Sequence, residues 1–122
     1  MVEPRDPKIY ATTDGEPPDP NYEDGGAPKP IEAATGQHGS YWILSAEERA
    51  KGFVRPVRQS YKHLKCGAVT RMGLAIAETY ARNPAFYGAT FCVQCRDHLP
   101  VGAYGQFVWL DGSVETTEKV GT

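Results

Sequence analysis

Two cysteines and a histidine lie within seven consecutive positions of the chain, at Cys92, Cys95 and His98. The one other cysteine, Cys66, is separated from Cys92 by 25 residues and follows His63 by three positions. Thiolate sulfur and imidazole nitrogen are the ligands of structural zinc, and four of them form a tetrahedron around the ion. The types and the spacing of these residues therefore predict a zinc site.

Five candidate ligands are present for four positions, and their spacing allows two arrangements. In the first, His63-x2-Cys66 and Cys92-x2-Cys95 are two pairs of equal spacing that the fold brings together. In the second, Cys92-x2-Cys95-x2-His98 provides three ligands and Cys66 provides the fourth. In either arrangement zinc would contribute on the order of 10 kcal/mol of folding free energy to a body whose core is small.

The same residues are compatible with other roles. Thioredoxin-type redox sites share the Cys-x2-Cys spacing, but such a pair begins a helix, and Pro100 and Gly102 follow too soon for a long one. A nucleophilic pair such as Cys95 and His98 is a second alternative, and cysteines packed as small apolar side chains are a third. The nucleobase deaminase pattern is absent because Glu78 has no histidine two positions before it. We therefore expect a protein without enzymatic activity.

The N-terminal third of the chain differs in composition from the rest. Residues 1–36 contain seven of the ten prolines, eight acidic residues and three basic ones, whereas residues 37–122 contain seven acidic and ten basic residues. A charged, proline-rich segment with few large aliphatic side chains buries too little apolar area to offset the entropy of ordering. We expect an acidic, extended Pro/Gly-rich arm over residues 1–40, either laid across a partner or left as a flexible tail.

The expected fold is a small zinc-stapled α+β domain over residues 41–112. Ser45 with Glu48 three positions later forms a capping box, and Gly52 is suited to end a helix, so a short helix is predicted between them. Around Pro56 we expect an extended segment or an edge strand, because proline cannot donate a ladder hydrogen bond.

The main helix is predicted to begin at Thr70, a permitted N-cap, and to end at Arg82 or Asn83, because Pro84 prevents it from continuing. Its expected buried face repeats at helical spacing and consists of Met72, Ala75, Ile76, Thr79 and Tyr80.

Residues 106–112, with the sequence QFVWLDG, are predicted to form a strand that ends in an Asp-Gly turn. Side chains alternate along a strand, so Phe107 and Trp109 share one face while the opposite face is also apolar. This pattern indicates a strand buried on both faces, or one whose aromatic side chains cover the metal site. Residues 113–122 are expected to form an exposed tail.

Six basic residues lie between positions 49 and 65: Arg49, Lys51, Arg55, Arg58, Lys62 and Lys65. Such a run is ordinarily a solvated face, and the alternative is a surface for a phosphate backbone or an acidic protein. No stretch has the ~18–20 apolar residues of a membrane span, and the N-terminus lacks the pattern of a signal peptide. Three cysteines without a secretory feature predict reduced thiols in a cytosolic environment.

The stretch CGAVTRMGLAIAETYARNPAFYGATFCVQCRDHLPVGAYGQFVWLDG, residues 66–112, resembles small uncharacterised proteins encoded by tailed bacteriophages. Those proteins share the pattern CG-x-x-T-x-M-G, then A-E-T-Y-A-R-x-P-x-F-Y-G-x-T-F-C-x-x-C-x-x-H-F-P-V, and then F-V-W. The upstream stretch YWILSAEERAKGFVRPVR is similar to them as well. The resemblance implies a phage origin and a zinc-binding body, and it implies no particular activity.

The resemblance also implies a choice among the candidate ligands. In the phage pattern the cysteine that matches Cys66 often lacks a histidine three positions earlier, so His63 becomes the reserve ligand. Leu99 departs from the pattern, which has phenylalanine there, and another apolar side chain should be tolerated. The ligands implied are therefore Cys66, Cys92, Cys95 and His98.

Together these expectations favour a non-enzymatic structural or interaction protein of a bacteriophage virion, of the head-associated accessory or cement type, with a structural Zn²⁺. Its partners would be other virion proteins, with the arm of residues 1–40 laid across a partner surface, and it would be assembled in the host cytoplasm. The alternative is an intracellular phage zinc-binding module that binds a host protein, or nucleic acid through the basic run of residues 49–65. No membrane role is expected.

Overall fold

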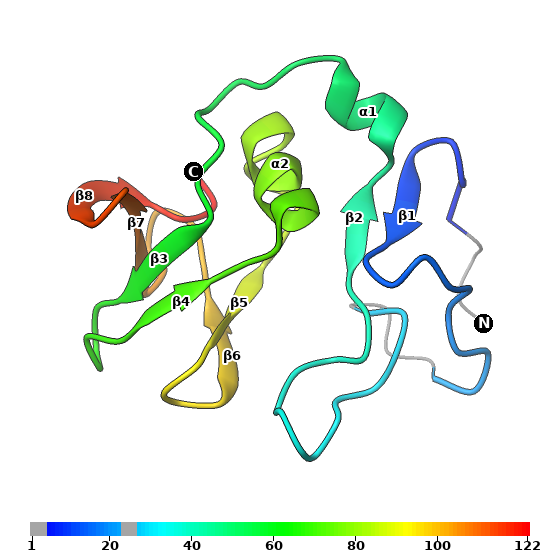
Figure 1. Cartoon of the computed structure of the whole chain (residues 1–122), viewed down its shortest axis with the longest axis horizontal. Helices are drawn as coiled ribbons and strands as arrows, with labels where there is room; N and C mark the ends of the chain where they lie inside the picture. The colour runs from blue at the N-terminus through cyan, green and yellow to red at the C-terminus, as the bar shows by residue number, and fades with distance from the viewer. Residues whose placement is uncertain (1–4, 23–26) are drawn as a thin grey trace. The chain divides into compact units, whose positions relative to one another are not determined.

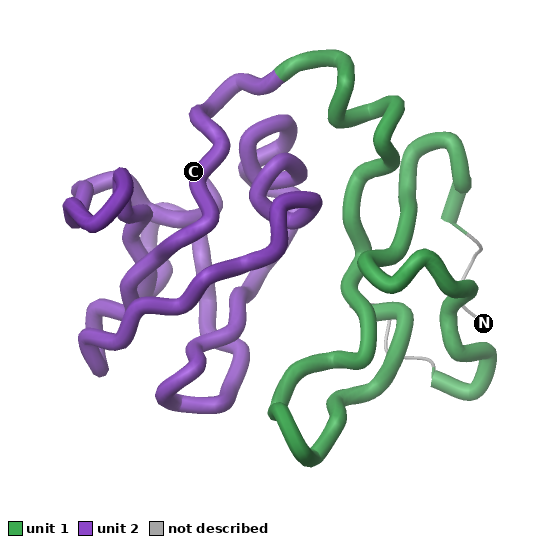
Figure 2. The backbone as a smooth tube through the Cα atoms, in the orientation of Figure 1, with its two compact units in different colours: residues 1–52 green, residues 53–122 purple. Residues whose placement is uncertain are grey.

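The computed structural model describes residues 5–22 and 27–122, which belong to two compact units, residues 1–52 and residues 53–122 (Figures 1 and 2). The named strands of the described residues pair antiparallel throughout, and the helices are few and short. The expectation of a small α+β fold is confirmed at this level.

The N-terminal unit contains a short strand pair. β1 (Tyr10–Thr12) pairs antiparallel with β2 (Trp42–Leu44), and Ala11 lies opposite Ile43. Ile43 and Leu44 are buried, as their apolar side chains require.

A short helix, α1 (Ala46–Ala50), follows β2. The side chain of Ser45 accepts a hydrogen bond from the amide of Glu48, so the predicted N-cap is confirmed. The Ser45 hydroxyl also donates to the carbonyl of Lys8, which ties the helix start to the segment before β1. Gly52, with φ at +112°, follows the helix in a conformation that favours glycine.

The extended arm expected over residues 1–40 is not supported, because the described part of this stretch is folded. The amide of Asp19 donates to the carbonyl of Pro28, whose side chain is fully buried, and Asp14 pairs with Lys29 and accepts from Ser40. Turns and the pairing of β1 with β2 provide hydrogen-bond partners for the backbone of this stretch, which the composition of the stretch did not predict. The unit accordingly ends at Gly52. The part of the arm prediction that concerns residues 1–4 and 23–26 lies outside the described residues.

The C-terminal unit contains a four-stranded antiparallel sheet with the order β4-β3-β7-β8 (Figure 1). The strands are β3 (Ser60–His63), β4 (Val69–Arg71), β7 (Phe107–Asp111) and β8 (Val114–Lys119). Four consecutive residues of β7 are buried, from Phe107 to Leu110, so the predicted strand with two buried faces is confirmed.

A separate two-stranded hairpin is formed by β5 (Ala89–Cys92) and β6 (Asp97–Pro100). The hydroxyl of Tyr61 in β3 donates to the carbonyl of Phe91 in β5 and so connects the hairpin to the sheet. The helix α2 (Leu74–Arg82) completes the core. The buried residues of this core are Tyr61, Met72, Ala77, Tyr80, Cys92, Phe107, Trp109 and Val120.

The main helix begins later than predicted. Thr70 lies in β4, opposite Tyr61, and its hydroxyl accepts a hydrogen bond from the amide of Val93, so it cannot act as the helix cap. The N-cap is Gly73, and the end at Arg82 agrees with the prediction. The residues of α2 that are buried are Ala77, Thr79, Tyr80 and Ala81. Pairing with β3 keeps the backbone extended at Thr70. The helix therefore begins about one turn later than the apolar spacing of the sequence predicts.

The prediction that residues 113–122 form an exposed tail is wrong, because most of them form β8 and Val120 after it is buried. Val108 lies opposite Lys119 and Leu110 opposite Glu115, with a β-bulge between them. Val120 is fully buried in the core. The sequence did not predict β8, because its side chains are mostly polar or charged and exposed. An edge strand with one solvated face has few apolar residues by which it could be recognised.

Candidate metal centre

Two β-hairpins bring four potential ligands together. His63 is the last residue of β3, and Cys66 lies in the turn between β3 and β4. Cys92 is the last residue of β5, and Cys95 lies in the turn between β5 and β6. Each hairpin thus provides one ligand from a strand end and a second ligand three positions later. This group could hold a metal ion.

The two turns share the same backbone geometry. The amide of Gly67 donates to the carbonyl of His63 at 2.7 Å, and the amide of Arg96 donates to the carbonyl of Cys92 at 2.8 Å. The residue after the second ligand has a positive φ in both turns, +78° at Gly67 and +52° at Arg96. A non-glycine residue is uncommon in this region, so the shape of the second turn is imposed by its surroundings.

The separations between donor atoms suit a tetrahedral ion. The Sγ atoms of Cys66 and Cys92 lie 3.6 Å apart, and Nδ1 of His63 lies 3.5 Å from Sγ of Cys95 and 3.1 Å from Sγ of Cys66. All four donor atoms lie within 4.8 Å of one another. Zinc bond lengths predict edges of about 3.8 Å between two sulfurs and about 3.6 Å between sulfur and nitrogen. The cluster is therefore close to the size of a zinc tetrahedron.

The His63 ring is held in the orientation that ligation requires. Its Nε2 lies 2.7 Å from Oε1 of Gln106, so Nε2–H donates to this oxygen and Nδ1 keeps its lone pair for the cluster. The ring stacks on Phe107, with 4.8 Å between ring centroids, and His63 is buried. A ligating histidine commonly has such a partner on its second nitrogen.

The thiols of the cluster interact electrostatically. Burial raises the pKa of Cys92, but hydrogen bonds from the Cys95 amide, the Cys66 thiol and the Gln94 amide outweigh it and lower this pKa to about 7. The pKa of Cys95 is raised to about 11, first by partial desolvation and then by hydrogen bonding and charge at Cys92 and Cys66. Cys92 therefore forms a thiolate readily, and its negative charge opposes the formation of a second thiolate at Cys95. A bound cation would remove this repulsion.

The structure brings together three of the four residues that the resemblance implied, Cys66, Cys92 and Cys95, and it places His63 with them. His98 lies in β6 opposite Phe91, and its ring contacts the Phe91 ring at 5.4 Å between centroids. Of the two arrangements that the spacing allowed, the geometry favours the two equal pairs. The matched spacing His-x2-Cys and Cys-x2-Cys was the signal in the sequence for this outcome.

Gln106 was not identified by sequence reasoning. It directly precedes β7, and the carbonyl of Pro100 accepts its backbone amide. The pairing of His63 with Phe107 brings position 106 beside the histidine ring. Only the strand register reveals this contact, because 43 residues separate the two in the chain.

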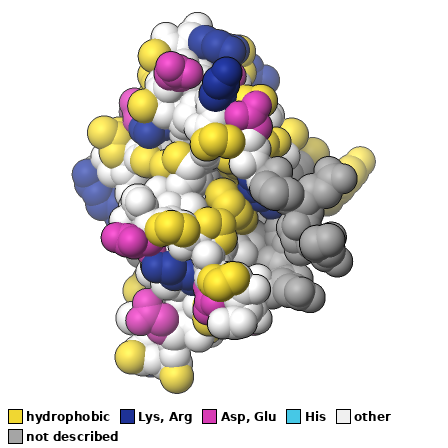
Figure 3. Space-filling view, turned by 90° about the vertical axis from the view of Figure 1, so that its right-hand side faces the viewer, with side chains coloured by type: hydrophobic (Ala, Val, Ile, Leu, Met, Phe, Trp, Pro, Cys, Tyr) yellow, Lys and Arg dark blue, Asp and Glu magenta, His cyan; other side chains and the backbone are white. Residues whose placement is uncertain are grey.

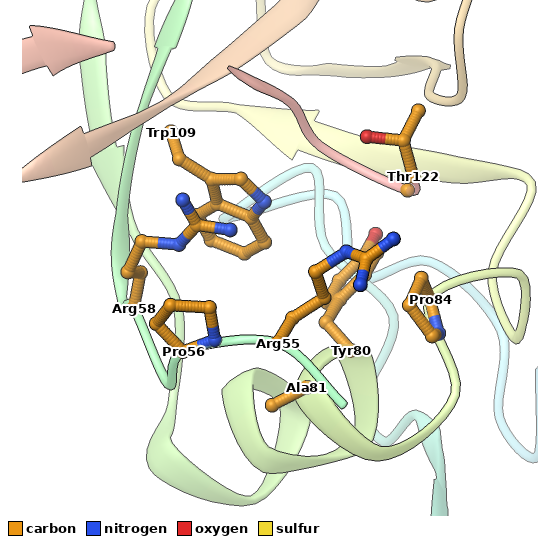
Figure 4. Close-up of a pocket in the computed structure, with 9 residues that line it drawn as sticks. Arg55, Pro56, Arg58, Tyr80, Ala81, Pro84, Trp109 and Thr122 are labelled. Atoms are coloured by element: carbon orange, nitrogen blue, oxygen red, sulfur yellow. The ribbon is translucent and has the colours of Figure 1, made fainter. Parts of the chain in front are cut away.

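The C-terminal unit also has a shallow hollow, open to solvent, of about 190 Å³ beside α2 and β7 (Figure 4). Figure 4 shows the guanidinium group of Arg58 against the Trp109 indole, and 5.1 Å separates Arg58 Cζ from the ring centroid. Arg55 and Tyr80 also line the hollow. This volume includes open solvent and the hollow encloses no cavity, so it gives no support for a small-molecule site.

Three of the six basic residues between positions 49 and 65 pair with neighbouring carboxylates. Arg58 pairs with Glu118, and Lys62 pairs with Glu115 at 2.7 Å, both partners being on β8. In the N-terminal unit Lys51 pairs with Glu48. On the face that Figure 3 shows, acidic and basic side chains are interspersed rather than gathered by sign. These pairs weaken the interpretation of residues 49–65 as an anion-binding surface.

Comparison with known proteins adds no relative. No family model, no curated protein and no solved structure matches this chain. Within residues 5–22 and 27–122, no helix has the length and apolar character needed to cross a membrane.

Proposed function

We propose that the C-terminal unit binds one zinc ion through His63, Cys66, Cys92 and Cys95. The observation that carries this proposal is the delivery of four donors, all within 4.8 Å of one another, by two hairpin turns with the same hydrogen bond and a positive φ at the same position. Three sulfurs and one imidazole nitrogen form a donor set suited to zinc. The filled d shell of Zn²⁺ imposes no coordination geometry of its own, so the ion accepts the tetrahedral arrangement of its ligands. Carboxylate-preferring ions such as Mg²⁺ and Ca²⁺ fit this set poorly.

The proposed zinc is structural rather than catalytic. Four protein ligands complete a tetrahedron and leave no position for water or substrate. The ion would join the β3–β4 hairpin to the β5–β6 hairpin, on either side of α2 in the chain. The free energy of zinc binding would then contribute directly to the stability of residues 53–122. We accordingly propose a non-enzymatic structural or interaction module.

The proposed biological role is that of an accessory protein of a phage virion, with other virion proteins as partners. This role rests on the resemblance of residues 66–112 to phage-encoded proteins. It no longer draws on an extended arm, because the described part of residues 1–40 is folded. The nucleic-acid alternative has less support, since Arg58 and Lys62 already have acidic partners.

Metal analysis of protein purified under reducing conditions tests the zinc proposal. We expect one zinc ion per chain, and a chelator that removes it should increase hydrogen exchange in β3, β4 and β5. Amides of the β1–β2 pair serve as an internal reference, because their hydrogen bonds do not involve the metal. A reduced, folded protein without bound metal that also fails to bind added Zn²⁺ would refute the proposal.

The virion role requires a separate experiment. Mass spectrometry of purified phage particles whose genome encodes this chain should detect the protein at a fixed copy number relative to the major capsid protein. Its absence from particles, while it is present in the infected cell, would refute the virion role and leave the zinc proposal intact.

A further inference from the structure

Two sulfurs of the cluster come from different hairpins and lie close to each other. Sγ of Cys66, in the β3–β4 turn, is 3.6 Å from Sγ of Cys92, at the end of β5. Cys66 is exposed to solvent and Cys92 is buried. Cys95 is exposed as well, but it comes from the same hairpin as Cys92. A reagent in solution can therefore approach Cys66, and the sulfur of Cys92 beside it is positioned to react with the product.

We propose that Cys66 and Cys92 form an oxidation site, at which a peroxide produces an inter-hairpin disulfide and the bound zinc is released. The inference rests on the proposed zinc site and names a way in which that site is regulated. Disulfide formation requires the two sulfurs to approach by about 1.6 Å, from 3.6 Å to the S–S bond length of about 2.05 Å.

The chemistry takes place in two steps. The thiolate of Cys66 attacks one oxygen of hydrogen peroxide, the O–O bond breaks, and sulfenic acid and hydroxide are formed. The thiolate of Cys92 then attacks the sulfenic sulfur, which forms the S–S bond and releases a second hydroxide. The peroxide is reduced by two electrons and the two sulfurs are oxidised by two. An ion held by His63, Cys66, Cys92 and Cys95 would keep two of its four ligands after this reaction and would be released as Zn²⁺, without a change in oxidation state.

The competing disulfide joins Cys92 to Cys95. That bond would lie within one hairpin turn, where the Cys95 amide already points to Sγ of Cys92, and it would leave the two hairpins unconnected. The Cys66–Cys92 bond instead joins the same two hairpins that zinc joins. It also closes a loop that includes α2, and a disulfide that closes a longer loop restricts the unfolded chain more. The oxidised, zinc-free unit should therefore remain folded.

The test treats the reduced, zinc-loaded full-length protein with limiting hydrogen peroxide. Released zinc is measured with a colorimetric chelator, remaining thiols are alkylated, and tryptic peptides are mapped by mass spectrometry. Trypsin separates residues 66–71, which contain Cys66, from residues 83–96, which contain Cys92 and Cys95. We expect one zinc released per peroxide consumed, the two peptides joined through Cys92, and Cys95 alkylated.

Two variants make the result specific. Cys95→Ser should still form the disulfide, whether or not it retains zinc, whereas Cys66→Ser should lose it. A Cys92–Cys95 bond as the main product, or zinc release without a linked peptide, would overturn the inference. The zinc content before peroxide is added tests the proposed function separately: zinc-loaded protein that forms no disulfide refutes only the oxidation site. Protein that binds no zinc refutes the metal proposal, and with it the release of zinc.

Thermal unfolding of the oxidised product provides a second readout. We expect the Cys66–Cys92 protein without zinc to unfold at a higher temperature than the reduced protein without zinc. Equal unfolding temperatures would contradict the claim that the disulfide takes over the role of the metal in joining the hairpins.

Discussion

Nε2 of His63 lies 2.7 Å from Oε1 of Gln106, across the pairing of β3 with the segment that leads into β7. This contact fixes which nitrogen of the imidazole carries the proton, and it directs Nδ1 toward the three cysteines. A residue 43 positions away in the chain thus orients the imidazole within the candidate metal centre.

Replacing Gln106 with alanine should weaken zinc binding by about 10- to 100-fold, because the ring loses the acceptor that orients it. Gln94→Ala is the matched control, since Gln94 is exposed in the turn between Cys92 and Cys95. Competition with a chromophoric chelator measures both affinities. Equal affinities for the two variants would show that Gln106 does not position the ligand.

Replacing His63 with alanine should abolish stoichiometric zinc binding, whereas His98→Ala should leave it unchanged. The reason is that His63 belongs to the cluster while His98 packs beside Phe91. His63→Cys should restore a four-ligand site, because thiolate is an equally suitable zinc ligand. Zinc content after dialysis distinguishes these variants. Loss of zinc in His98→Ala with retention in His63→Ala would support the ligand set that the resemblance implied.

Replacing Gly67 with alanine should destabilise the C-terminal unit by about 1 kcal/mol, because a side chain at a φ of +78° is strained. Gly88→Ala is the control, since Gly88 lacks a positive φ and an added Cβ meets no atom within 4 Å. Chemical denaturation of the zinc-loaded variants measures the difference. If both substitutions have the same effect, the turn does not require glycine.

Replacing Val120 with alanine should cost about 2 kcal/mol of unfolding free energy, because it removes two buried methyl groups and leaves a cavity. Val114→Ala, at the exposed start of β8, should change stability little, because this side chain is 66 % exposed. Urea denaturation compares the two variants. Equal, small effects would indicate that residues 113–122 form a tail rather than part of the core.

Asp14 should make the N-terminal unit sensitive to acid. The hydrogen bond with Lys29, opposed by partial burial and aided by the Glu16 amide and the Ser40 hydroxyl, holds the Asp14 pKa well below its ordinary value. A depressed pKa stabilises the folded unit above the unfolded-state pKa of about 4, and this contribution is lost progressively as the pH falls below that value.

Asp14→Asn should therefore lower protection of the N-terminal amides at neutral pH and have a smaller effect at acid pH. The effect should be modest, because the pair is partly exposed to solvent. Hydrogen exchange of the Tyr41 amide, which donates to Thr13, gives the measurement at several pH values. An effect of Asp14→Asn that does not depend on pH would contradict this account.

The short-range features of the chain followed from its sequence. Ser45 caps α1, because the hydroxyl and the amide it accepts from are three residues apart. The apolar run from Phe107 to Leu110 forms a strand with both faces buried. The two residue types of the candidate metal centre, cysteine and histidine, could also be recognised, since ligand chemistry depends on side-chain type and on local spacing.

The tertiary structure decided which histidine joins the cysteines. Residues opposite each other in an antiparallel pair point to the same face, and successive residues alternate between faces. Cys92 lies opposite Asp97 in the β5–β6 hairpin, so His98 lies opposite Phe91 and points to the other face. Pairing of β3 with β7 places His63 opposite Phe107 within the core. His63 and His98 each lie three positions from a cysteine, so spacing in the chain did not distinguish the two histidines. Only the register of the strands did.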